Sequence, residues 1–170
     1  MLKPSLEKAL NEQINKELFS AYLYQAMSAY ASRTGLPGVA NWMDIQAKEE
    51  MDHARKFYNY IDEQGAKITL MAIDQPDTDF ESVNVMFAKT LEHEQFITKS
   101  IYDLVTLARD EHDYATEIFL QWYITEQVEE ESNVNELIDK LNLIGKEGNG
   151  IFMFDKELTT RVYTPMVFGE

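Results

Sequence analysis

The stretch Glu49-Glu50-Met51-Asp52-His53 places ionisable side chains on the mainly apolar inner face of a predicted helix. Residues spaced at three and four, the spacing of one helical face, form a stripe through it. The stripe runs Val39, Met43, Gln46, Glu50, His53 and Phe57. Because Glu50 and His53 are three residues apart, their side chains point to the same side of the helix. A single Glu-x-x-His pair is a weak indication of a metal site, so the rest of the chain decides.

Three further segments carry the same kind of stripe, each interrupted near its middle by a carboxylate. The four central carboxylates are Glu17, Glu50, Glu94 and Glu130. Since each lies near mid-helix, they meet at one level of a bundle whichever way each helix runs. A lone glutamate usually lies at a boundary in water. Four at the same depth, with no lysine or arginine on the stripes, predict a shared centre.

Glycine and proline divide the chain into predicted helices at residues 5–33, 37–65, 81–109 and 114–143. Ser5 is the expected N-cap of the first helix, Gly65 the C-cap of the second, and Gly145 the end of the fourth. Two short turns join antiparallel neighbours. The segment 66–80 can extend about 50 Å, enough to cross a bundle of helices about 43 Å long. The predicted fold is all-α, a four-helix bundle with one long crossover, which is the ferritin-like connectivity.

The C-terminal region is predicted to add a short fifth helix over residues 149–160. Residues 161–170, which include Pro165, form a tail without an assigned structure. The predicted organisation is therefore one domain, residues 1–160, followed by a tail.

Composition excludes several classes of protein. The net charge of −15 makes nucleic acid a poor partner, because phosphate binding needs a basic surface. Cysteine is absent, which excludes disulfides and thiolate sites and fits a reducing cytoplasm. No apolar run is long enough for a membrane span, and the N-terminus has no apolar signal region. We expect a cytoplasmic protein that attracts cations.

Four buried carboxylates require compensation, because an unpaired buried charge costs several kcal/mol. Two divalent cations would balance them, and His53 and Gln127 would add neutral donors. Oxygen-rich ligation with one imidazole suits iron or manganese better than structural zinc. The sequence therefore predicts a two-metal centre.

Other candidates have two readings each. Tyr24 is either aromatic core or a redox-active neighbour of the metals. The flanking carboxylates either form a solvated cluster or hold a third cation; they are Glu49, Glu126 and Glu129. Met51 either fills a gap in the packing or ligates a haem shared between two subunits. His93 and His112 show no partner pattern and are expected at the surface.

The chain resembles the bacterial and archaeal non-haem ferritins over residues 1 to about 160. The resemblance rests on four stretches, which are residues 10–17, Glu49-Glu50-Met51-Asp52-His53, Glu92-His93-Glu94, and residues 121–131. Bacterioferritins carry a second Glu-x-x-His where this chain has Gln127-x-x-Glu130, which disfavours haem. The tail from Arg161 departs from the family pattern.

The resemblance implies a role for each matched residue. It implies one iron position at Glu17, Glu50 and His53, with Glu50 bridging, and a second at Glu94, Gln127 and Glu130. It implies a third iron held by Glu49, Glu126, Glu129 and Glu130, and a tyrosine, Tyr24, beside the centre.

The resemblance further implies a ferroxidase that oxidises Fe(II) with dioxygen or peroxide and stores ferric mineral. The family does so inside a homo-oligomeric cage of twenty-four subunits, with the fifth helix near the fourfold axes. A haem-bearing protein and a purely structural bundle are the alternatives.

Overall fold

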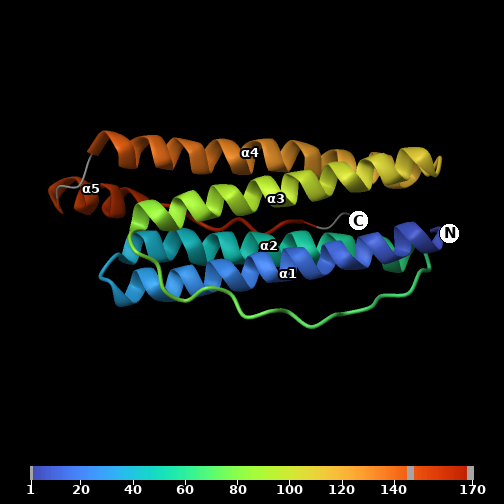
Figure 1. Cartoon of the computed structure of the whole chain (residues 1–170), viewed down its shortest axis with the longest axis horizontal. Coiled ribbons are helices and arrows are strands. Elements are labelled where there is room, and N and C mark those ends of the chain that lie inside the picture. The colour runs from blue at the N-terminus through green and yellow to red at the C-terminus, as the bar shows by residue number, and fades with distance from the viewer. Residues whose placement is uncertain (1, 145–147, 168–170) are drawn as a thin grey trace.

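The computed structural model describes residues 2–144 and 148–167, which fold into helices without strands. The helices are α1 (Pro4–Arg33), α2 (Pro37–Glu63), α3 (Val83–Asp110), α4 (Tyr114–Ile144) and α5 (Gly148–Leu158). Figure 1 shows α1 to α4 side by side as an elongated bundle, with α5 at one end. The all-α fold and the short fifth helix are therefore confirmed. Among the described helices, none is both long enough and apolar enough to cross a membrane.

The helix ends follow local capping rules, with two corrections to the sequence prediction. Helix α1 begins at Pro4 after Lys3, so Ser5 is not its N-cap; the Ser5 hydroxyl instead donates to the Glu111 carboxylate. Helix α3 begins two residues later than predicted, because the Ser82 side chain accepts a hydrogen bond from the Val85 amide. Gly145, the expected end of the fourth helix, lies outside the described residues.

The predicted end of α2 at Gly65 is confirmed. Gly65 has φ 65°, the left-handed conformation that glycine adopts most easily. The following amide, of Ala66, donates back to the Ile61 carbonyl at 3.1 Å. This closes the helix end and turns the chain into the long connection.

The long connection between α2 and α3 runs the length of the bundle (Figure 1). Helix α1 holds it at several points. The Asn11 amide bonds the backbone of Lys67 and Thr69, at 2.9 and 2.6 Å. At the other end, the Tyr30 hydroxyl donates to the Phe80 carbonyl at 2.6 Å. The predicted crossover is therefore confirmed, and the connection lies along α1.

The apolar core is divided into two clusters with a polar layer between them. One cluster includes Tyr24, Met27, Met43, Phe87 and Val134. The other includes Leu10, Ile14, Phe57, Ile97 and Tyr123. The four central carboxylates lie along the chain between these residues on every helix and are buried. The common level predicted for these carboxylates is therefore the polar layer between the two apolar clusters.

Helix α5 docks onto the start of α2. The buried Asp155 carboxylate accepts a hydrogen bond from the Val39 amide at 2.9 Å, which satisfies a free N–H at the helix N-terminus. A Cβ on Gly38 would lie 1.6 Å from the Asp155 carbonyl oxygen, so only glycine permits this approach. This contact fixes where the tail after α5 begins.

Candidate metal centre

Glu17, Glu50 and His53 form the first half of the centre. All three are buried, and each offers a ligand atom within 4.8 Å of the others'. His53 Nδ1 lies 3.3 Å from Glu50 Oε2 because the two residues share one face of α2. Glu17 reaches them from α1, whose register places it beside this part of α2. Two helices thus present two carboxylates and one imidazole to a single point.

Glu94 on α3 and Gln127 on α4 are the candidates for the second half, and they contact each other. Gln127 Nε2 donates to Glu94 Oε2 at 3.0 Å, and the Tyr24 hydroxyl donates to Glu94 Oε1. Tyr24 is fully buried, as the aromatic-core reading expected, and it also contacts a predicted ligand. The redox reading of Tyr24 stays a prediction.

Glu130 completes the set and is held by a residue outside the predicted ligands. The amide of Gln46 on α2 donates to Glu130 Oε2 at 2.6 Å. Burial, followed by the charge of Glu94, raises the pKa of Glu130 from 4.5 to about 8. The charge of the Glu94 carboxylate therefore acts directly on the ionisation of Glu130.

Burial is also the main cause of the raised pKa of Glu17, Glu50 and Glu94. For His53, burial alone lowers the pKa, but the neighbouring carboxylates, Glu50 foremost, outweigh it and raise the pKa well above its ordinary value. Without a metal, the cluster therefore favours holding protons. A divalent cation would replace those protons and make the ionised carboxylates favourable.

A series of hydrogen bonds fixes the position of the Glu17 carboxylate. Gln13 Nε2 donates to Glu17 Oε1 at 2.9 Å, and the Ser100 hydroxyl donates to Gln13 Oε1 at 2.6 Å. Lys16 Nζ in turn donates to Ser100 Oγ at 2.5 Å. No role was predicted for Gln13. The sequence signal that could have identified it is an amide four residues before a carboxylate of the stripe.

Glu17 Oε2 is buried, and among the described residues no N–H or hydroxyl donates to it, which leaves only a proton shared with the Glu50 carboxyl. Buried carboxylate oxygens normally have a partner, so this atom points to a missing ligand. The surrounding donors are carboxylate oxygens, one imidazole and one amide, which is the set that iron and manganese accept. The residues present fit a two-metal centre.

The candidates for a third cation are brought together only in part. Glu126 Oε1 lies 3.7 Å from His53 Nε2, and Glu126 joins His53 and Glu130 in a second potential metal-holding group. Glu49 instead pairs with Arg161 of the tail, Oε2 to Nη2 at 2.5 Å. Glu129 is exposed. The third site therefore stays a prediction, and the tail residue that touches it was missed.

His93 was expected at the surface; it is half-buried and lines a hollow in the surface. Its ring packs against Phe19 and Tyr24, and its Nε2 lies 2.7 Å from Ser20 Oγ. Burial lowers the His93 pKa to about 4. These contacts with α1 shield one side of the ring, which helix periodicity did not reveal. His112 is exposed, as expected.

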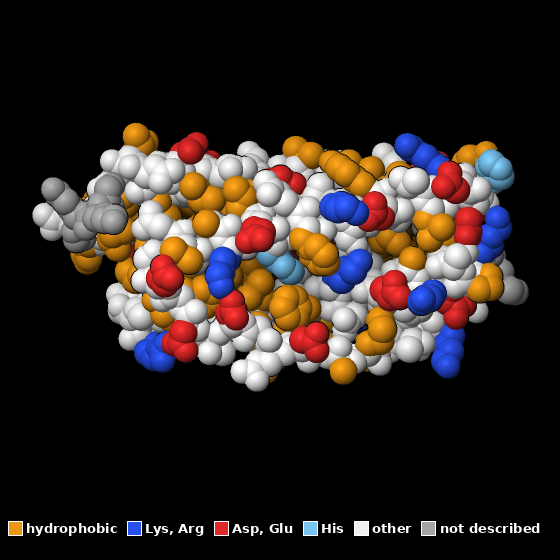
Figure 2. Space-filling model, viewed as in Figure 1, with side chains coloured by type: hydrophobic (Ala, Val, Ile, Leu, Met, Phe, Trp, Pro, Cys, Tyr) orange, Lys and Arg blue, Asp and Glu red, His pale blue; other side chains and the backbone are white. Residues whose placement is uncertain are grey.

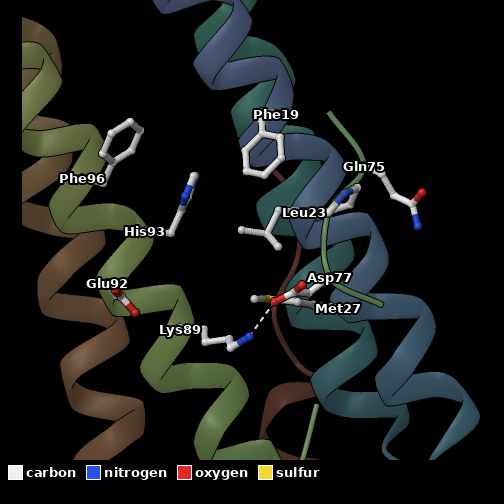
Figure 3. A pocket seen from close by; sticks show the side chains of 10 residues that line it. Phe19, Leu23, Met27, Gln75, Asp77, Lys89, Glu92, His93 and Phe96 are labelled. Carbon is white, nitrogen blue, oxygen red and sulfur yellow. Dashed lines mark hydrogen bonds and ion pairs between the residues drawn. The ribbon is translucent and has the colours of Figure 1, made fainter. Parts of the chain in front are cut away.

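His93 lines a hollow of about 470 Å³ between α1, α3 and the crossover. Figure 2 shows a histidine side chain among apolar side chains near the middle of this face. In Figure 3, Phe19 and Leu23 face His93 across it, and Lys89 pairs with Asp77 at its edge. Met51 lies on another surface and is 51% exposed.

Comparison with known proteins agrees with this geometry. The family model for ferritin, described as a ferritin-like domain, matches residues 7–144. The bacterial non-heme ferritin of Campylobacter jejuni is 44% identical over 156 residues, covering 92% of this chain and 93% of the relative. That of Staphylococcus aureus strain MRSA252 is 42% identical over 163 residues, covering 96% of this chain and 98% of the relative.

Solved structures give the same result. An open-pore ferritin of the archaeon Archaeoglobus fulgidus is 41% identical and superposes with a TM-score of 0.94, covering 95% of this chain and 100% of that one. A closed form engineered from the same archaeal ferritin gives a TM-score of 0.95 at 41% identity, covering 96% of this chain and 100% of that one. The resemblance carried by the sequence is confirmed: this chain belongs to the ferritin family, among the non-haem ferritins.

Proposed function

We propose that this chain is a ferroxidase as well as a member of an iron-storage family. Two Fe(II) ions are its substrates, bound at the centre between the two apolar clusters. The ligands are Glu17, Glu50 and His53 for one ion and Glu94, Gln127 and Glu130 for the other. Dioxygen or peroxide takes up one electron from each iron, and the ferric product is stored.

The observation that carries the proposal is the Glu17–Glu50–His53 group. Its ligand atoms lie within 4.8 Å of one another, with all three side chains buried. Glu17 Oε2, to which no N–H or hydroxyl donates among the described residues, lies in this group. A purely structural bundle would gain stability by replacing such residues with apolar ones, since a buried polar cluster without full satisfaction is costly.

The chain's own residues prepare the site for oxidation. His53 is fixed by the Tyr123 hydroxyl, which donates to the His53 carbonyl at 2.8 Å. Glu94 is fixed by Tyr24 and Gln127 on its two oxygens. Binding of Fe(II) displaces the protons that burial keeps on the carboxylates. The rising positive charge of iron on oxidation is then stabilised by groups already in position.

We further propose a homo-oligomeric cage, of twenty-four subunits as in the resemblance, in the cytoplasm. Helix α5 exposes Phe152 (67%) and Met153 (61%), large apolar side chains that a subunit contact would cover. The solved relatives are themselves ferritins, including an open-pore form. Size-exclusion chromatography with light scattering measures the assembly directly.

The experiment for the ferroxidase adds Fe(II) to metal-free protein without oxygen, admits air, and follows ultraviolet absorbance. We expect a fast rise that saturates near two irons per chain, the number of proposed positions. Glu50→Ala and His53→Ala should lose the fast phase. Glu63→Ala, an exposed glutamate on the same helix, is the matched control and should keep it. A fast phase that persists in both site variants would refute the assignment.

A further inference from the structure

The tail after α5 is held along α2 by contacts that do not depend on the charge of Arg161. Asn41 Nδ2 donates to the Arg161 carbonyl at 3.1 Å. Farther along, Asp52 Oδ2 accepts from the Tyr163 hydroxyl at 2.6 Å and from the Met166 amide at 3.0 Å. Figure 1 shows the tail folding back from α5 toward the middle of the bundle. The tail is thus a strap fixed on both sides of Arg161.

The Arg161 guanidinium lies at the edge of the metal centre. Its Nη2 is 2.5 Å from Glu49 Oε2, and its Nη1 donates to Gln46 Oε1 at 3.0 Å. Its Cζ stacks 4.6 Å from the centre of the Trp42 ring. The side chains of Arg161 and Glu49 are 23% and 26% exposed, so the pair is largely shielded from water. The Arg161 guanidinium is therefore held in a defined position by its contacts and is not freely solvated.

Arg161 engages a second carboxylate through Gln46. Because the guanidinium has only donors, Gln46 must turn its oxygen toward Arg161. The amide nitrogen of Gln46 then points the other way, and it donates to Glu130 Oε2 at 2.6 Å. One cation thus occupies Glu49 directly and an oxygen of Glu130 indirectly.

These two carboxylates border a potential metal-holding group. His53, Glu126 and Glu130 offer ligand atoms within 4.8 Å of one another. Glu49 borders this group, because Arg161 contacts both Glu49 and Gln46, and Gln46 donates to Glu130. A metal ion held there would need oxygens that Arg161 and Gln46 now occupy.

We propose that Arg161 is a built-in competitor for a third cation beside the paired centre. The guanidinium and a divalent metal ion exchange for the Glu49 and Glu130 oxygens, so the tail sets how tightly that third ion binds. The inference rests on the proposed function, because it needs a cation-binding centre at His53 and Glu130.

The physical basis is that two cations cannot share these oxygens. A metal ion entering beside Arg161 must displace it and meets repulsion from its charge, in surroundings only partly screened by water. When the metal is absent, Arg161 offsets the repulsion among the carboxylates. When Arg161 moves, it can return to solvent without unfolding the strap, because Asn41 and Asp52 still hold the backbone.

The test is calorimetric titration of the metal-free full-length protein with Fe(II) without oxygen. Four variants accompany the wild type. Arg161→Gln removes the charge, and Arg161→Lys restores it. Tyr163→Phe removes a strap contact without changing charge, and Glu49→Gln removes the carboxylate that Arg161 occupies.

We expect two tighter ions and a weaker third in the wild type. Arg161→Gln should tighten the third ion roughly tenfold, as expected for removing a close like charge from a partly buried site. Arg161→Lys should lie within a few-fold of wild type. Tyr163→Phe should not tighten the third ion, and Glu49→Gln should weaken it whether or not Arg161 is present.

Three results would overturn the inference. If Arg161→Gln leaves the third ion unchanged while two ions still bind tightly, Arg161 does not compete, and the proposed function stands. If Tyr163→Phe tightens it as much as Arg161→Gln, loosening of the strap is the cause. If the wild type binds no Fe(II) tightly, the proposed function fails and the inference fails with it.

Discussion

Replacing Glu130 with glutamine should make the metal-free protein more stable near neutral pH. Burial, then the charge of Glu94, raises the Glu130 pKa from 4.5 to about 8. The folded state thus holds a proton that the unfolded chain has released at pH 7. Glutamine has no such proton to hold, and its oxygen can still accept from Gln46.

The sign and size follow from proton linkage. Because the folded-state pKa is the higher one, the folded state is favoured most below pH 4.5, and stability falls as pH rises toward about 8. The slope is about 1.4 kcal/mol per pH unit, so the loss by pH 7 is at most about 3.5 kcal/mol. Titration shared with neighbouring carboxylates reduces it. A gain of about 1–3 kcal/mol corresponds to roughly 2–12 °C in melting temperature for a chain of this size.

The assay is thermal unfolding by circular dichroism of chelator-treated protein at pH 4.5 and pH 7. Glu130→Gln should melt higher than wild type at pH 7, and the difference should shrink at pH 4.5. Glu129→Gln, an exposed neighbour on the same helix, controls for the loss of one charge. A Glu130→Gln protein that melts at or below the wild-type temperature at pH 7 would refute the reasoning.

Three further predictions concern packing, the tyrosine and pH. Gly38→Ala should lower the melting temperature, because its methyl would lie 1.6 Å from the Asp155 carbonyl oxygen and separate α5 from the Val39 amide. Loss of that cap costs about 1 kcal/mol or more. An unchanged melting curve would contradict the close approach. Tyr24→Phe should slow Fe(II) oxidation in stopped-flow absorbance while leaving two-ion binding in place, because it removes one hydrogen bond to Glu94; an unchanged rate would assign Tyr24 to packing alone. The rise in melting temperature caused by Zn(II) should be larger at pH 8 than at pH 6, because the raised carboxyl pKa values make protons compete with the metal at the lower pH; an equal rise at both would argue that the metal binds elsewhere.

The sequence predicted the bundle and the level of its polar layer because both follow from local periodicity. Each carboxylate interrupts an apolar stripe, and a helix fixes which residues share a face without knowledge of its neighbours. The buried positions of Glu17 and Glu94 follow from that alone. Gly65 likewise predicted the end of α2, because a residue in the left-handed conformation closes a helix through hydrogen bonds within one turn.

Contacts between distant segments were decided only by the tertiary structure. Ser5 is separated by 106 positions from its partner Glu111. Local capping rules therefore could not show that its hydroxyl contacts Glu111 and does not cap the helix. His93 packs against Phe19 of α1, a neighbour that the periodicity of α3 does not identify. Gln46 lay on the predicted stripe, yet its direction is set by Arg161 from 115 positions away.

The division is a physical one. A helical pattern determines which side chains are turned inward and where helices end, because those depend on neighbours within a few residues. The third-cation candidates depended on something else, namely where the chain after α5 goes. Asp155 docks α5 onto α2, and the tail then carries Arg161 to Glu49. The tail thus brings a cation from the far end of the chain to Glu49, a residue that the sequence indicated only as a candidate ligand.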